Sequence, residues 1–196
     1  MRAMQRRNRP DEAGASMVEG AISISLVAAL LFAVFQFALL GSAYLDTRNA
    51  ANGGARSGAI AAAESNADYV ILAAVAKQAT MVPKTNIKRI VIFKAASTES
   101  SLDDSGLSAC KTGSVTGVCN SYAGSVLTGL DPAVFGTGPS GIDGKWGPTT
   151  RGTSRTVGAD LLGVFVQIES QDIGGLIPLK KTFEETSIVR LETTTS

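Results

Sequence analysis

The strongest hydrophobic pattern in the chain is a run of 26 residues, Gly20 to Leu45, that contains no Asp, Glu, Lys or Arg. A helix of about 20 apolar residues spans the ~30 Å hydrocarbon core of a bilayer. The polar side chains within the run include Ser23, Ser25 and Gln36, and a serine hydroxyl can donate to a helix carbonyl. The pattern therefore predicts a transmembrane helix over residues 15–45, with membrane lipid around it.

The pattern remains helical after the apolar run. Alanine dominates from Tyr44 to Val82, apolar residues recur at three- and four-residue steps, and Pro83 is expected to end the helix. Two interpretations of Gly54 and Gly58 are open. Their spacing allows close helix packing, or they mark a flexible bend between the membrane helix and a globular domain.

Three β-strands are predicted within residues 86–95, 159–170 and 180–193, the first of them because it is rich in β-branched residues. The last two each have an apolar face, made by Leu162, Val164, Val166 and Ile168 in one and by Phe183, Val189 and Leu191 in the other. We expect two of the strands to pair antiparallel, with the helix from about residue 66 covering the sheet. The expected fold class is α+β: a long N-terminal transmembrane helix continuing into an extracytoplasmic helix packed on a small antiparallel sheet.

Residues 96–159 differ in composition and are predicted to be a long Gly/Ser-rich loop insertion. They contain 12 of the 21 glycines, and structureless loops longer than about 15 residues are uncommon in compact domains. Five apolar residues indicate that part of the insertion packs: Leu127, Leu130, Val134, Phe135 and Trp146.

The insertion also contains the two cysteines of the chain, Cys110 and Cys119. We expect a disulfide between them if this region lies outside the membrane, where thiols oxidise. A catalytic or metal-binding pair is the poorer alternative, because the spacing is not Cys-x-x-Cys and the chain has no histidine.

The charge distribution predicts how the chain crosses the membrane. Arg2, Arg6, Arg7 and Arg9 precede the apolar run, and positively charged flanks stay in the cytoplasm. The sequence therefore predicts a single-pass protein of the cytoplasmic membrane, with residues 46–196 forming an extracytoplasmic domain.

Composition argues against several other functions. The net charge is +1 and no stripe of Lys or Arg with aromatic residues is present, so we expect no nucleic-acid partner. The absence of histidine removes the commonest general base. The adjacent acidic pairs Asp103–Asp104 and Glu184–Glu185 point apart if they lie on strands. We expect no enzyme activity, catalytic residue, cofactor, metal site or small-molecule substrate.

Glu19 stands directly before the apolar run, five residues after Gly14. With Ser16 it forms a Ser-x-x-Glu capping box, which predicts a helix N-terminus there. A glycine, four residues and a glutamate, between basic residues and an apolar helix, is also the cleavage layout of type IV prepilins. The two interpretations do not exclude each other.

Taken together, these segments resemble the TadE/TadG-like minor pilins (pseudopilins) of the tight-adherence (Flp-type) pilus system. The matching stretches are GASMVEGAI at 14–22, the apolar helix after it, DTRNAANGGARSGAIAAA at 46–63 and FEETSIVRLE at 183–192. The chain departs from ordinary type IV pilins in having Ala15 where an aromatic residue is common, and from many relatives in having no proline within the membrane helix.

The resemblance implies that residues 1–14 are a cytoplasmic leader that a prepilin peptidase removes between Gly14 and Ala15. Glu19 would then be the fifth residue of the mature chain and would serve assembly. The implied partners are the peptidase, other pilin subunits and the pilus assembly machinery. The implied function is pilus assembly and surface adhesion, at the membrane and on the pilus or cell surface.

Three alternatives remain at this point. In the first, the chain is an uncleaved bitopic surface protein with a non-catalytic exported domain, which predicts an intact Met1. In the second, signal peptidase cuts after the small residues Gly41, Ser42 and Ala43, although the apolar run is longer than a secretory signal. The third alternative is an exported enzyme, for which the sequence shows no convergent carboxylate pair.

Overall fold

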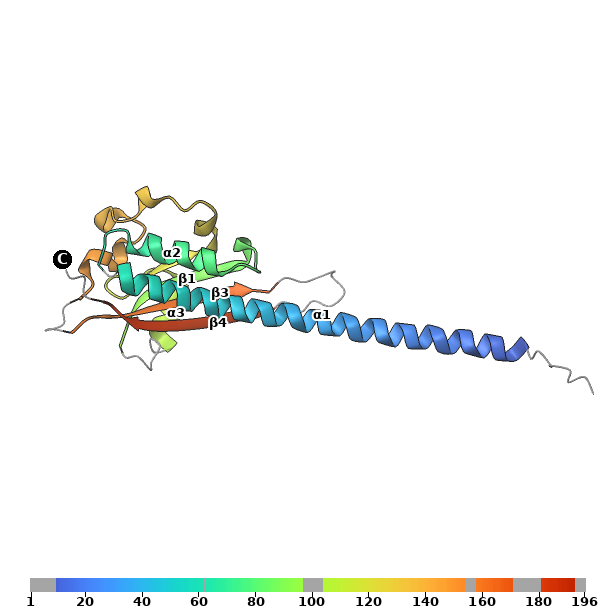
Figure 1. The fold of residues 1–196 in the computed structure, drawn as a ribbon. Helices are drawn as coiled ribbons and strands as arrows, with labels where there is room; N and C mark the ends of the chain where they lie inside the picture. The colour runs from blue at the N-terminus through green and yellow to red at the C-terminus, as the bar shows by residue number, and fades with distance from the viewer. Residues whose placement is uncertain (1–9, 62, 97–103, 154–157, 171–180, 193–196) are drawn as a thin grey trace, which may run out of the picture. The chain divides into compact units, whose positions relative to one another are not determined.

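The computed structural model of the chain describes residues 10–61, 63–96, 104–153, 158–170 and 181–192 (Figure 1). The chain divides into two compact units, Met1–Leu40 and Gly41–Ser196. Helix α1 (Pro10–Ala61), 52 residues long, contributes to both.

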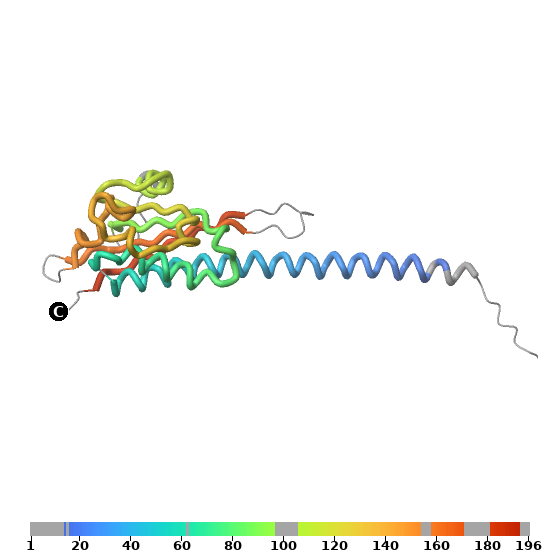
Figure 2. Tube along the Cα trace, turned by 90° about the horizontal axis from the view of Figure 1, so that it is seen from above, coloured from blue at the N-terminus to red at the C-terminus, as the bar shows by residue number. Residues whose placement is uncertain are grey.

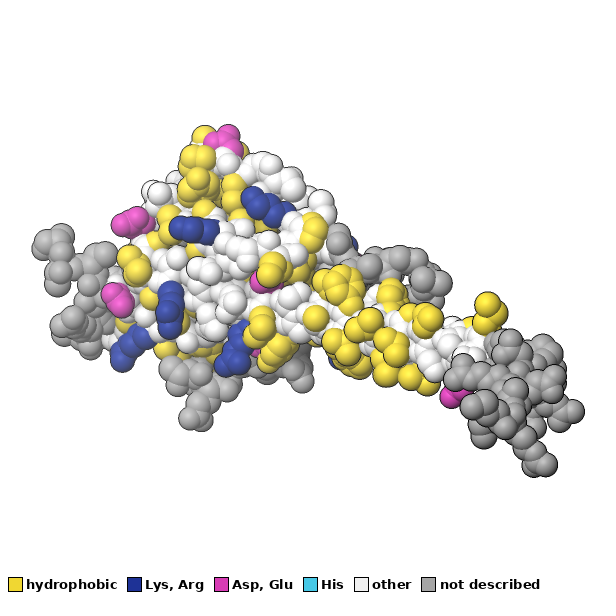
Figure 3. Space-filling model, turned by 45° about the vertical axis from the view of Figure 1, so that its right-hand side comes forward, with side chains coloured by type: hydrophobic (Ala, Val, Ile, Leu, Met, Phe, Trp, Pro, Cys, Tyr) yellow, Lys and Arg dark blue, Asp and Glu magenta, His cyan; other side chains and the backbone are white. Residues whose placement is uncertain are grey.

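In the first unit, α1 leaves its large apolar side chains exposed. Most of those between Met17 and Phe37 expose more than half of their surface, and they give this stretch of helix its hydrophobic cover (Figure 3). The most apolar window of 18 residues has a mean hydropathy of 2.4 and none of it is buried. Among the described residues, α1 is the one helix long and apolar enough to cross a membrane. The long apolar N-terminal helix expected from the sequence is thus confirmed.

The second unit contains a four-stranded antiparallel sheet in the order β2-β1-β3-β4. Its strands are β1 (Ile87–Ala95), β2 (Cys119–Ala123), β3 (Leu161–Glu169) and β4 (Thr182–Arg190). Strands β1, β3 and β4 were predicted from the sequence, β1 from its β-branched residues and the other two from their apolar faces. In the central pair, Ile90 faces Val166 and Ile92 faces Val164 across the ladder. The α+β class is therefore confirmed.

Strand β2 lies in the segment predicted to be a loop insertion. Residues 96–159 contribute β2 and helix α3 (Asp104–Thr112), so a continuous loop is not confirmed. The rest of the described segment contains five short 3₁₀ helices: η2 (Gly124–Thr128), η3 (Pro132–Val134), η4 (Gly138–Ser140), η5 (Gly144–Trp146) and η6 (Pro148–Thr150). Leu127, Phe135 and Trp146 are buried as expected, whereas Val134 is exposed.

One face of the sheet is covered by the second half of α1 and by helix α2 (Ala67–Gln78) (Figure 1). The helical pattern from Tyr44 to Val82 is divided between these two elements, and the helix expected from about residue 66 to cover the sheet is confirmed as α2. After α2 the chain passes through η1 (Lys84–Asn86) into β1. The core on this face includes Ala50, Ala51, Ala55, Ile71, Leu72, Val75, Ile90, Ile92, Leu162, Val164, Val166 and Ile168.

Gly54 and Gly58 bring α1 close to this core. A Cβ atom on Gly54 would lie 2.8 Å from the Val75 side chain, and one on Gly58 would overlap the Leu162 side chain. Both glycines lie inside the helix, which continues to Ala61. Close packing is therefore the interpretation that holds, and the flexible bend is not observed.

The opposite face of the sheet is covered by α3, as Figure 2 shows. Here the alternate residues of the same strands pack in a second, smaller core of Val91, Phe93, Ala95, Phe165, Cys110 and Cys119. Because a strand presents successive side chains to opposite faces, β1 and β3 serve both cores.

Candidate functional site

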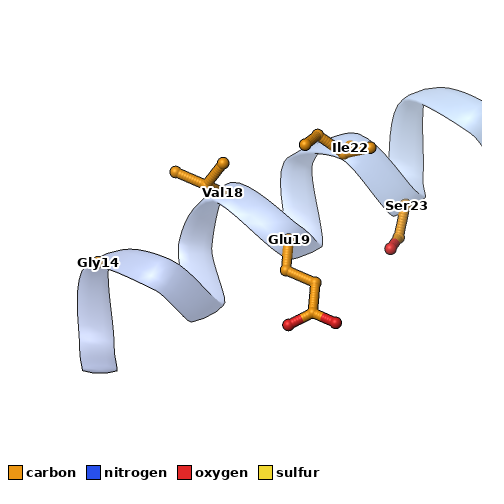
Figure 4. A pocket seen from close by; sticks show the side chains of 5 residues that line it. All are labelled: Gly14, Val18, Glu19, Ile22 and Ser23. Atoms are coloured by element: carbon orange, nitrogen blue, oxygen red, sulfur yellow. The ribbon is translucent and has the colours of Figure 1, made fainter. Parts of the chain in front are cut away.

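The residues predicted for processing and assembly lie together near the start of α1. Gly14, Ala15 and Glu19 are all helical, and Gly14 and Glu19 are exposed. Figure 4 shows the Glu19 carboxylate pointing away from the helix, on a different side from Val18 and Ile22. With Gly14 and Ser23, these residues line a shallow depression in the helix surface. Within the described residues, Glu19 has neither an ion-pair nor a hydrogen-bond partner.

The structure corrects the capping box. Helix α1 begins at Pro10, six residues before Ser16, so Ser16 lies inside the helix and cannot be its N-cap. The earlier start has a physical reason. Proline is favoured in the first turn because it has no N–H to leave unpaired, and Asp11 and Glu12 favour the positive end of the helix dipole. Glu19 is therefore a mid-helix carboxylate rather than a capping group.

Ser25, within the apolar run, forms the hydrogen bond to a helix carbonyl that the sequence predicts. The Ser25 hydroxyl donates to the Ala21 carbonyl oxygen at 2.8 Å. Such a bond removes most of the cost of placing a hydroxyl in apolar surroundings.

The first charged residue after the apolar run, Asp46, is buried and was not predicted to have a role. Its carboxylate accepts hydrogen bonds from the backbone N–H groups of Met81 (2.6 Å) and Val82 (3.0 Å). The hydroxyl of the next residue, Thr47, donates to the carbonyl oxygen of Ala43, one turn earlier in the helix, at 2.7 Å. Asp46 thus joins α1 to the segment that follows α2, satisfying two backbone donors that lie beyond the end of that helix.

The structure contains the disulfide between Cys110 and Cys119. Cys110 lies in the last turn of α3 and Cys119 is the first residue of β2, with their Cα atoms 6.2 Å apart. Both are fully buried beside Phe93 and Phe165. The disulfide therefore ties α3 to the sheet within the smaller core.

A buried polar group centred on Asp68, here called the Asp68 cluster, was missed by the sequence analysis. It consists of Asp68 from α2, Asn120 and Tyr122 from β2, and Trp146 and Arg151 from the following segment. The Asp68 carboxylate accepts hydrogen bonds from Tyr122 Oη at 2.6 Å and from Asn120 Nδ2 at 2.8 Å. It also pairs with Arg151 Nη2, and the side chains of both ionic partners are fully buried.

Trp146 completes the cluster through its backbone and its ring. The backbone N–H of Trp146 donates to Asn120 Oδ1 at 2.8 Å. Its backbone carbonyl oxygen accepts from Asn120 Nδ2 at 2.9 Å and from Arg151 Nη2 at 3.2 Å. The Arg151 guanidinium lies 4.4 Å from the centroid of the Trp146 ring, a cation–π contact. The cluster therefore fixes α2, β2 and the 3₁₀-rich segment to one another.

The electrostatics of the Asp68 cluster keep Tyr122 neutral. Burial, followed by the negative charge of Asp68 and its hydrogen bond, raises the pKa of Tyr122 far above its ordinary value. The phenol is therefore a hydrogen-bond donor at all physiological pH values. Because the cluster is closed to solvent, its chemistry is that of a structural network.

The remaining polar groups do not form a metal centre. Within the described ranges, no three Cys, Asp or Glu side chains lie close enough to hold a metal ion. Lys111 of α3 donates to Glu184 of β4 at 2.7 Å, and Gln167 donates to the same carboxylate at 2.6 Å. This exposed group links α3 to the edge of the sheet.

Comparisons with known proteins give no family for the chain. It matches no family model, and neither a curated protein nor a solved structure shows significant similarity to it.

Proposed function

We propose that this chain is a membrane-anchored TadE/TadG-like minor pilin. In this proposal a prepilin peptidase cuts between Gly14 and Ala15, and the mature chain takes part in assembling a tight-adherence pilus and in surface adhesion. The observation that carries the proposal is the character of α1. It exposes a long apolar surface directly after a carboxylate, Glu19, and the same helix continues into the core of the α+β unit.

The geometry near Glu19 suits a role after cleavage. A cut behind Gly14 creates an α-amino group on Ala15, four residues before Glu19. Residues at this spacing lie on the same face of a helix. An unpaired charge near the middle of a bilayer costs about 2.5 kcal/mol or more. A carboxylate one turn from the new amino group, in the same or a neighbouring subunit, offsets that cost.

The second unit supports the export of residues 46–196. Its disulfide is typical of proteins that fold in an oxidising compartment. Its core includes small residues from the second half of α1, among them Ala50 and Ala55. In this proposal the domain presents the adhesive or assembly surface, and α1 holds it at the membrane.

The position of Ala43 favours this reading over cleavage by signal peptidase. Ala43 is buried in the larger core, and its carbonyl accepts the Thr47 hydroxyl. A cut after Ala43 would remove a core residue and the first partner of Thr47. The uncleaved bitopic protein stays as the alternative, and it predicts that Met1 is retained.

The test measures the mass of the membrane-extracted chain and its recovery in sheared surface filaments. Gly14→Val should leave the leader in place, because the peptidase is expected to recognise the glycine. Gly20→Val is the matched control, since a Cβ atom at either glycine meets open space. Glu19→Val should be processed but should lose most of its recovery in filaments.

Ser23→Val is the control for Glu19→Val. Ser23 lies one turn further along and changes from a polar to an apolar side chain without loss of charge. If Ser23→Val is recovered normally in filaments and Glu19→Val is not, the loss is caused by removal of the carboxylate. Wild-type recovery of Glu19→Val in filaments, or an intact Met1 in the unaltered chain, would contradict the proposal.

A further inference from the structure

A polar groove lies within the second unit, between α1 and the edge strand β4. It has a volume of about 350 Å³ and is lined by Tyr44, Arg48, Ala51, Asn52, Glu185 and Thr186. The four α1 residues follow the three- and four-residue steps that place side chains on one helix face. The volume is at the small end of ligand sites, which range from roughly 300 to 1,000 Å³.

The two charges of the groove are not used in the fold. Among the residues that the structure describes, neither Arg48 nor Glu185 has an ion-pair partner within 4.0 Å. The neighbouring carboxylate of the same strand, Glu184, binds Lys111 at 2.7 Å. Successive strand residues face opposite sides, so Glu184 serves the α3 side while Glu185 is left for the groove. A cation and an anion thus share one small site without contacting each other.

The surroundings of the groove have the composition of a membrane interface. Tyr44 forms an edge-to-face pair with Phe183 of β4, with ring centroids 6.2 Å apart. Lys181 Nζ lies 5.8 Å from the centroid of the same Phe183 ring. Tyrosine and basic residues gather where a membrane helix leaves the hydrocarbon. On α1 itself, Arg48 follows Leu45 by three residues, or about 4.5 Å of helix rise.

We propose that this groove binds the headgroup of a zwitterionic phospholipid with a primary amine, the phosphoethanolamine class. Arg48 binds the phosphate, to which Asn52 and Tyr44 can add hydrogen-bond donors. Glu185 accepts from the ammonium group. The inference rests on the proposed function in one respect: an α1 that crosses a bilayer brings lipid headgroups to the level of Arg48.

The chemistry of the lining selects this class over other headgroups. With a purely anionic headgroup, Arg48 would pair with the phosphate and the Glu185 carboxylate would have no cation as a partner. A quaternary ammonium has no N–H to donate to that carboxylate, and it is usually held by several aromatic faces, whereas Tyr44 is the one aromatic side chain lining the groove. A primary ammonium has three donors that a carboxylate can accept.

The experiment titrates the full chain, in detergent micelles, with three short-chain lipids that differ in the headgroup alone. These are dihexanoyl phosphatidylethanolamine, phosphatidylcholine and phosphatidylglycerol. The readout is the Nε–Hε NMR signal of Arg48, assigned by its loss in Arg48→Gln. We expect a saturable shift with an affinity about tenfold higher for the ethanolamine lipid, the value of one hydrogen bond to a charged group.

Variants test each part of the site. Glu185→Gln should reduce the preference for ethanolamine over choline to about twofold or less, since the charged acceptor is gone. Arg48→Lys should keep that preference, measured through the backbone signals of the groove. Arg56→Gln is the matched control: Arg56 is an exposed arginine of the same helix that does not line the groove. It should bind as the unaltered chain does.

Free phosphoethanolamine and inorganic phosphate, titrated in the same way, distinguish a lipid from a soluble phosphate. Binding of either as tight as that of the lipid would overturn the lipid assignment. Equal affinity for the three lipids, or an unchanged preference in Glu185→Gln, would overturn the headgroup assignment. These titrations need neither leader cleavage nor filaments, and the processing test does not depend on Arg48. Failure of the groove and failure of the pilin proposal are therefore distinguishable.

Discussion

Helix α1 exposes its largest apolar residues before Leu40, whereas after Gly41 it buries its smallest ones. Ile24, Leu31 and Phe37 of the first half expose more than half of their surface. In the second half the buried residues are alanines such as Ala50 and Ala55. Hydrophobicity and burial therefore run in opposite directions along a single helix. A large exposed apolar surface is typical of a contact with lipid or with another protein. Small buried residues are typical of close helix packing.

The charged groups show the same contrast. Glu19 in the first half is exposed and has no partner within the described residues. Asp68 in the second unit is fully buried and has three hydrogen-bonding side-chain partners. A carboxylate that stabilises the fold is thus surrounded by donors, while one without donors is available for an intermolecular role.

The largest expected effect comes from breaking the Asp68 cluster. Arg151→Met should lower the free energy of unfolding of the second unit by about 3–5 kcal/mol, because it leaves the buried Asp68 charge unpaired. Unfolding of the full chain in micelles, followed by fluorescence of the single, buried Trp146, measures it. Arg190→Met, at an exposed arginine of β4, should change the value by about 0.5 kcal/mol or less.

A double variant sharpens this prediction. Asp68→Asn with Arg151→Met removes both charges, so it should be less destabilising than the sum of the single changes. Additive losses would show that Asp68 and Arg151 do not act as a pair.

A smaller effect tests the contrast between the two halves of α1 directly. Gly58→Leu should destabilise the second unit by about 1–3 kcal/mol, because a side chain there overlaps Leu162 in the core. Gly20→Leu places the same side chain on the first half, where a Cβ atom meets open space. It should leave the Trp146 unfolding transition unchanged. Equal effects of the two variants would contradict the different packing of the halves.

The smallest expected effect is the acid sensitivity of the Glu184 link. Partial burial raises the pKa of Glu184, but the hydrogen bonds from Lys111 and Gln167 and the Lys111 charge outweigh it, so the pKa falls below 4.5. Because its pKa is lower in the folded state, ionised Glu184 stabilises the fold at pH values above the ordinary pKa of 4.5. This contribution is lost as the pH falls through the folded-state pKa.

Because the Glu184 pair is exposed, Glu184→Gln should destabilise by less than about 1 kcal/mol at pH 7. The difference from the unaltered chain should disappear as the pH falls through the lowered pKa of Glu184 in the folded state. Denaturant titrations at several pH values measure it. Glu185→Gln is the control: the adjacent carboxylate has no ion-pair partner in the described structure, so the change should alter the free energy of unfolding at pH 7 by about 0.5 kcal/mol or less. A pH-independent loss in Glu184→Gln would exclude the linkage.

Local pattern predicted most of the secondary structure. In β3, Leu162, Val164, Val166 and Ile168 alternate with other residues, and this period of two is visible in any short window. Strand β2 escaped prediction because its sequence, CNSYA, is short and contains no Val, Ile, Leu or Phe. Its pairing with β1 supplies the stability that its own composition lacks.

The Asp68 cluster could not be predicted for a different reason. Asp68 and Arg151 are 83 residues apart, and no local rule links them. The one available signal was an aspartate inside an otherwise apolar helical stretch, which calls for a partner when buried. The processing and assembly roles of Gly14, Ala15 and Glu19 came from a motif and stay predictions.

The hydrogen bonds of Asp46 have a mechanical consequence. Asp46, Gly54 and Gly58 contact the rest of the second unit, and the first and last of them are 12 positions apart on α1, or about 18 Å of helix. A pulling force applied along α1 is therefore resisted by hydrogen bonds and side-chain contacts that are loaded together, in shear. A subunit tethered by a flexible linker would transfer the load to a single point at the edge of its domain. If the chain is the pilin proposed above, a load along its fibre is distributed over several contacts within the second unit.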